Sequence, residues 1–106
     1  MTISDRYRQI VADLETCQSQ LAPSSEELAT EIKILAEAST QLHELLDQVG
    51  EIPRMRLETQ LTPVLLKAHS QLDRARLLLE DREEQGNTAD TVWDLQQAIY
   101  RLLNDL

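Results

Sequence analysis

Residues 61–79 read LTPVLLKAHSQLDRARLLL and decide the fold class of this chain. Apolar residues recur there at alternating intervals of four and three, at Leu61, Leu65, Ala68, Leu72, Ala75 and Leu79. Such spacing draws one apolar stripe along an α-helix, whereas a half-buried strand alternates at every second residue. The stretch therefore predicts an amphipathic helix with one face in a core.

The same spacing recurs near both ends of the sequence. Residues 5–21 predict a helix with Ser4 as its N-cap, because a serine hydroxyl can accept a hydrogen bond from a free backbone N–H. Its apolar stripe is Tyr7, Ile10, Leu14, Cys17 and Leu21. A last helix is expected to start in the polar segment 87–90 and to run to residue 106. Its stripe is Val92, Leu95, Ile99, Leu102 and Leu106.

A second helix is expected over residues 25–49, with Ser24 and Glu27 as a capping box in which each side chain satisfies a free backbone N–H. Gly50 follows at the position where helices commonly end in a left-handed residue. The stripe of this helix contains one polar member, Ser39, among Leu28, Ile32, Leu35, Leu42, Leu46 and Val49.

The segment 53–85 contains both the opening stretch and a proline within it. Pro53 suits the first turn of a helix, but Pro63 cannot donate a hydrogen bond to the carbonyl four residues earlier. We therefore expect a helix that is kinked or broken at Thr62–Pro63 rather than straight. Gly86 is expected to end it.

Composition agrees with an all-α fold. Leucine is the commonest apolar residue, and the whole chain has two glycines, three prolines and no phenylalanine. An all-β protein needs more turn residues than this. Short connections make successive helices antiparallel. The 106 residues therefore predict one all-α domain over 1–106, either a bundle of about four helices or a long helical hairpin with flanking helices, completed by a second copy of the chain.

The charge balance narrows the classes of partner. Ten lysines and arginines against nineteen acidic residues give a net charge of −9, which argues against binding to nucleic acid or to an anionic membrane. The first residues lack the apolar core of a signal peptide. One cysteine cannot form an internal disulfide. A cytoplasmic protein is the simplest expectation.

The charge is also unevenly distributed along the sequence. Residues 24–50 carry a net charge of −5, whereas residues 52–86 contain six basic and six acidic groups. Complementary charges of this kind would favour pairing of the second helix with the third.

Two histidines raise the question of metal binding, because each has an aspartate four residues later. His43 precedes Asp47 and His69 precedes Asp73, and two such pairs on one helix face could ligate zinc. Both histidines flank the apolar stripe, and the turn between their helices is expected to place them at different heights. We therefore expect solvent-facing His–Asp pairs, and neither a metal site nor a cofactor.

The sequence also lacks the patterns expected for a nucleophilic thiol or for a cationic active site. Cys17 falls within an apolar stripe, where a thiol is usually buried and inert. The arginines occur as near-neighbour pairs, Arg54 with Arg56 and Arg74 with Arg76. The two side chains of each pair point in different directions around the helix, so they do not converge on one pocket. We expect no enzymatic activity.

Residues 68–72, Ala-His-Ser-Gln-Leu, resemble the active helix of histidine phosphotransfer domains. That resemblance implies transfer of a phosphoryl group through His69, with a lysine and a glycine shortly after the histidine. This chain has Leu72 and Asp73 nearby instead, and an aspartate repels a phosphoryl group. Phosphotransfer through His69 is therefore the second alternative function.

The function expected first is that of a non-enzymatic protein–protein interaction module: a small acidic adaptor, regulator or dedicated chaperone. Its partner would be another protein with a basic surface, and the chain itself is expected to form a homodimer. Four residues off the apolar stripes are the predicted partner-binding residues, Leu66, Leu77, Trp93 and Tyr100. The first alternative is a homo-oligomeric structural protein. The purely structural alternative for Trp93 and Tyr100 is that both rings pack over the first helix near Tyr7 and complete the core.

Overall fold

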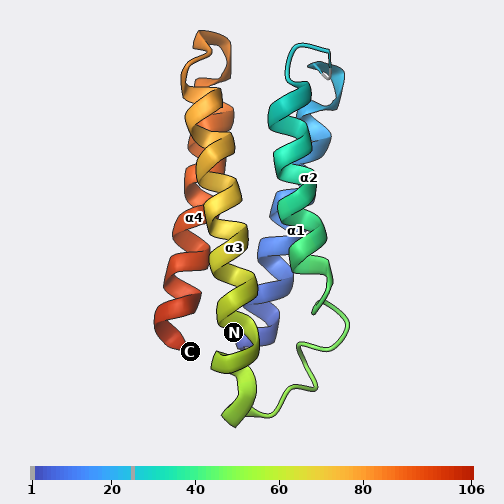
Figure 1. Ribbon diagram of the computed structural model, residues 1–106, viewed down its shortest axis with the longest axis vertical. Coiled ribbons are helices and arrows are strands. Elements are labelled where there is room, and N and C mark those ends of the chain that lie inside the picture. Colours follow the sequence, from blue (N-terminus) through green and yellow to red (C-terminus); the bar gives the residue numbers. More distant parts are fainter. Residues whose placement is uncertain (1, 25) are drawn as a thin grey trace.

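A computed structural model describes residues 2–24 and 26–106 of the chain (Figure 1). In these residues four α-helices follow one another: α1 (Ile3–Leu21), α2 (Ala29–His43), α3 (Arg54–Glu80) and α4 (Gly86–Asp105). Two short 3-10 turns, η1 (Ala22–Ser24) and η2 (Glu83–Gln85), lie in the α1–α2 and α3–α4 connections. The all-α prediction is confirmed.

The helices form an antiparallel bundle in which α1 packs on α2 and α4, while α3 packs on α2 and α4 (Figure 1). The bundle is an elongated body of 44 × 22 × 21 Å. Both chain ends and the α2–α3 connection lie at one end of the bundle, and the other two connections lie at the opposite end. Of the two expected architectures, the structure has the four-helix bundle.

Most residues of the predicted stripes form the core, and Ile32, Leu46 and Leu106 are partly buried against it. Fully buried leucines come from every helix, and α3 contributes the whole predicted series together with Leu57. Cys17 is 1% exposed, as predicted. Polar contacts lie at the edges of this core. Three of them join neighbouring helices: His43–Glu15 (2.6 Å), Arg6–Asp105 (2.6 Å) and Gln96–Asp73 (3.1 Å). A fourth, Arg82–Glu31 (2.6 Å), joins the α3–α4 connection to α2. The Arg82–Glu31 ion pair is the kind of contact expected between the segments 24–50 and 52–86.

The start of α1 differs from the prediction. Thr2, not Ser4, is the N-cap: its extended backbone lets its hydroxyl accept from the Asp5 N–H at 3.1 Å. The Asp5 carboxylate in turn accepts from the Thr2 N–H, which completes a capping box. Because this box satisfies two free N–H groups and a lone serine satisfies one, the helix begins two residues earlier.

The start of α2 also differs from the prediction. The N–H groups of Glu27 and Leu28 both donate to the Ser24 carbonyl, so that a turn occupies this segment and α2 begins at Ala29. The Ser24–Glu27 capping box therefore does not start the helix. The predicted first residue, Ser25, lies outside the described residues.

The end of α2 is set by a side chain from α1. The buried hydroxyl of Tyr7 donates to the Leu42 carbonyl, which also accepts from the Leu45 N–H at 3.4 Å and not from Leu46, as it would in a continuing α-helix. Leu46 donates to His43 instead, and turns replace the expected helix up to residue 49. Val49 still reaches the core. Gly50 does not adopt the predicted left-handed conformation, since no described residue has a positive φ.

α3 runs without interruption through Pro63, so of the two alternatives expected at Thr62–Pro63, a kink or a break, the break is wrong. Leu61 and Leu65 are both fully buried, which shows that the same face meets the core on either side of the proline. Pro63 itself is exposed. The backbone bond that it removes therefore lies on the solvent side, where water can satisfy the unpaired carbonyl.

The α3–α4 connection lies earlier in the chain than predicted. Helix α3 ends at Glu80, not at residue 85, and Gly86 begins α4 instead of ending α3. Gly86 has φ −56° and ψ −42°, which is ordinary helical geometry. The segment 87–90, predicted to hold the cap, is already within α4.

Candidate protein-binding surface

All four predicted partner-binding residues have exposed side chains. Their exposed fractions are 53% for Leu66, 50% for Leu77, 48% for Trp93 and 55% for Tyr100. The other large apolar side chains that are exposed in the described part of the chain are Met55 and Leu78. Exposed leucines occur singly on many proteins, so the question is whether these four lie together.

Contacts between α3 and α4 show on which side of α4 the aromatic residues lie. The guanidinium carbon of Arg76, on α3, lies 5.2 Å from the centroid of the Trp93 ring. Tyr100 follows Trp93 by seven residues, or two helical turns, and therefore lies on the same side. Trp93 borders α3 rather than α1, so the interpretation that its ring covers the first helix near Tyr7 is wrong. Tyr7 is instead buried between α1 and α2.

The two leucines lie on the matching side of α3. Leu66 and Leu77 are eleven residues apart, which is almost three whole turns, so they share one face of the helix. Asp73, which contacts α4 through Gln96, lies within about 40° of both around the helix axis. Leu66, Leu77, Trp93 and Tyr100 therefore lie on one outer surface of the α3–α4 pair, here called the α3–α4 face.

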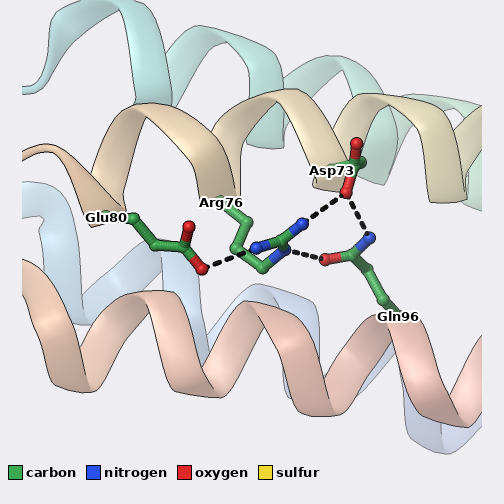
Figure 2. Close-up of polar contacts among 4 residues, drawn as sticks. All are labelled: Asp73, Arg76, Glu80 and Gln96. Carbon is green, nitrogen blue, oxygen red and sulfur yellow. Dashed lines mark hydrogen bonds and ion pairs between the residues drawn. The ribbon is translucent and has the colours of Figure 1, made fainter.

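A polar network of Asp73, Arg76, Glu80 and Gln96 joins α3 to α4 (Figure 2). The Arg76 guanidinium donates to Asp73 at 2.7 Å, to Gln96 at 2.9 Å and also to Glu80. Gln96 completes the ring by donating to the same Asp73 oxygen at 3.1 Å. Gln96 is 1% exposed and so fixes the network to the core.

The network favours the ionised forms of Asp73 and Arg76. Hydrogen bonds from Arg76 and then from Gln96 keep the pKa of Asp73 below its ordinary value. The hydrogen bond to Asp73, more than that to Glu80, raises the pKa of Arg76. Because three acceptors fix its guanidinium, Arg76 can hold one face of the Trp93 ring by a cation–π contact worth about 0.5–1 kcal/mol at an exposed site. This contact restricts the orientation of the Trp93 ring.

The two halves of the bundle differ in charge. Residues 1–51, which include α1 and α2, contain ten acidic and three basic residues. Residues 52–106, which include α3 and α4, contain nine acidic and seven basic residues. The α3–α4 face therefore belongs to the half that carries little of the net charge of −9.

The histidines are arranged differently from the predicted His–Asp pairs. His43 contacts Glu15 of α1 at 2.6 Å, and Asp73 takes part in the Arg76 network beside the half-buried His69. Among residues 2–24 and 26–106, no group of three or more His, Cys, Asp or Glu side chains is placed to hold a metal ion.

Cys17 lies at a groove of about 410 Å³ between α1 and α4, which Asp13, Leu95 and Arg101 also line. The thiol is nonetheless buried, and this burial raises its pKa. A thiol that holds its proton is a poor nucleophile. The groove therefore offers no activated thiol to a ligand.

The sequence pattern did not predict the network of Asp73, Arg76 and Gln96 beside Trp93. One signal was present: Gln96 occupies a core position, seven residues after Ala89, which is also buried. A buried glutamine needs polar partners, and Asp73 and Arg76 supply them. Pairing Gln96 with those two residues required knowledge of how α3 and α4 align.

No known protein family, no curated protein and no solved structure matches this chain. None of the helices in residues 2–24 and 26–106 combines the length and the apolar composition of a transmembrane span.

Proposed function

We propose that this protein is a non-enzymatic protein–protein interaction module and that the α3–α4 face binds its partner. The observation that carries the proposal is the convergence of four exposed apolar side chains, two of them aromatic, on one side of one helix pair. Aromatic residues at the edge of a core are the usual anchors of binding hot spots.

The ordered state of Trp93 supports this role. Association costs about 0.5–1.5 kcal/mol for each mobile side chain that must be fixed. The Arg76 guanidinium already lies over one face of the ring, so part of that cost is met in the free protein. About half of the Trp93 side chain remains exposed, and this remainder is the area that a partner can bury.

The surroundings of His69 favour binding over phosphotransfer. Asp73 lies one turn beyond His69, and its lowered pKa keeps it negatively charged at neutral pH. A phosphoryl group on His69 would meet that charge without the lysine that phosphotransfer domains supply. Incubation with a small phosphodonor, followed by a test for phosphohistidine, should therefore leave His69 unmodified.

Site-specific photo-crosslinking tests the proposed function directly. A photoreactive phenylalanine analogue placed at Tyr100 should form a discrete covalent adduct with protein in cells that make the chain. The same analogue at Ser19, an exposed position on α1, is the matched control and should give little adduct. Equal yields at the two positions, or no adduct at Tyr100, would contradict the proposal.

A further inference from the structure

We propose that the partner bound by the α3–α4 face is a second copy of this chain, in a dimer whose two-fold axis runs parallel to the helices. This inference rests on the proposed function, because it names the occupant of the same surface. It goes beyond the proposed function because it specifies which helix of one subunit lies over which helix of the other.

Charge favours the α3–α4 face over the face formed by α1 and α2 for contact between two copies. Contact through α1 and α2 would bring together two halves that each hold ten acidic and three basic residues. The α3–α4 half holds nine acidic and seven basic residues, so two such halves repel each other far less. The acidic half then stays on the outside of the dimer, available to the basic partner expected from the sequence.

The area of the α3–α4 face is adequate for a dimer. A helix of 20 residues such as α4 is about 30 Å long, and two adjacent helices of about 10 Å diameter give about 600 Å² of flat area. Stable interfaces bury about 1,200–2,000 Å² in total, or about 600–1,000 Å² on each partner, so the flat estimate meets the lower limit. Projecting side chains such as Trp93 and Tyr100 add to the flat estimate.

The apolar residues are self-complementary about an axis parallel to the helices. This axis places α3 of each subunit over α4 of the other without changing any height along the bundle. The Arg76–Trp93 contact shows that Trp93 and Leu77 lie at nearly the same height. Trp93 would therefore meet Leu77 of the partner subunit, and Tyr100 would lie within about one turn of Leu66 of the partner subunit.

The edges of the face carry charges that fit the same axis. Arg74 directly follows Asp73 and so lies about 100° further around α3, on the edge away from α4. Asp94 directly follows Trp93 and lies on the edge of α4 away from α3, where it lines the groove shared with α1. Arg74 and Asp94 lie at similar heights along the bundle. The proposed axis therefore brings Arg74 of one subunit opposite Asp94 of the partner subunit, and Asp94 opposite Arg74 of the partner subunit.

Sedimentation velocity over a range of concentrations tests whether the purified chain dimerises. Wild type should reach about twice the 12.1 kDa chain mass at micromolar concentration. Leu66→Glu with Leu77→Glu should weaken association at least tenfold, whereas Leu78→Glu, an exposed leucine on another side of α3, should leave it unchanged. Circular dichroism should show all three proteins equally helical.

Charge reversal tests the orientation of the axis. Arg74→Asp and Asp94→Arg should each weaken dimerisation several-fold, and the chain carrying both changes should recover. Failure to recover would overturn the proposed axis. A wild type that stays monomeric would overturn the second copy as the occupant, while a crosslink from Tyr100 to a different protein would still support the proposed function.

Discussion

Tyr7 shows how one hydroxyl can decide where a helix ends. Its O–H donates to the Leu42 carbonyl from the buried interface of α1 and α2, and the helical bond that this carbonyl would accept is replaced by turns. Burial, and to a smaller degree the charge of Glu44, raises the pKa of Tyr7 above its ordinary 10.0. The folded protein therefore retains a proton that the unfolded chain releases in alkali.

Tyr7→Phe should separate the two consequences of this hydroxyl. At neutral pH the variant should lose about 1 kcal/mol of stability with the hydrogen bond. Because the folded pKa is raised, the Tyr7 contribution is present below about pH 10 and is lost as the pH rises further. Urea unfolding at about pH 9 and about pH 11 should show a larger fall in unfolding free energy for wild type than for the variant. Equal falls would contradict the assignment to Tyr7.

Cys17 should be a structural residue only. Cys17→Ala should cost about 1–2 kcal/mol of unfolding free energy through lost burial and a small cavity. It should leave binding intact, because Cys17 lies in the groove between α1 and α4 and not on the α3–α4 face. An aromatic disulfide reagent should react with the native protein far more slowly than with the unfolded chain. Rapid reaction of the native protein would show that the thiol is accessible.

At the scale of single elements, the sequence predicted what depends on periodicity. Four helices were expected and four are present in the described residues, with the stripe of residues 61–79 buried as predicted. The helix ends were predicted less well, since their hydrogen-bond partners come from other parts of the chain. The end of α2 depends on Tyr7, which is 35 residues distant from Leu42.

Pro63 shows why the effect of a proline on a helix is difficult to predict from sequence. A proline within a helix is costly when the lost bond is buried, and the residue type alone does not tell which side of the helix it occupies. Counting positions from the apolar stripe would have placed Pro63 opposite the core. In the structure it is exposed, and α3 continues through it.

Gly86→Ala should stabilise α4. Gly86 has helical backbone angles, and an added Cβ would meet no atom within 4 Å. Alanine should therefore raise the unfolding free energy by about 0.5–1 kcal/mol, chiefly by restricting the unfolded chain. Thermal unfolding provides the measurement.

Gly50→Ala is the matched control for Gly86→Ala. There the added Cβ would lie 2.7 Å from Nη2 of Arg8, whose side chain would have to move. The gain in stability at Gly50 should accordingly be smaller or absent. If Gly86→Ala were destabilising, the assignment of Gly86 to the first turn of α4 would be contradicted.

At the scale of the whole molecule, the bundle combines an acidic half with a less charged half that carries the exposed apolar face. The sequence predicted Leu66, Leu77, Trp93 and Tyr100 from their positions off the stripes, and the structure places all four on the α3–α4 face. That they share a face depends on the alignment of α3 with α4, which contacts such as Gln96–Asp73 reveal and periodicity within single helices does not.

The central claim is that Trp93 serves association and not the core. The most direct test measures two quantities for the Trp93→Ala variant. One is the free energy of unfolding at a concentration where the chain is monomeric, and the other is the free energy of association. Leu95→Ala, two residues along α4 and 4% exposed, is the control and should lose about 2–5 kcal/mol of stability. We expect Trp93→Ala to change the unfolding free energy by about 1 kcal/mol or less and to weaken association by about 2 kcal/mol or more. A loss of about 3–5 kcal/mol in stability with association unchanged would contradict the claim.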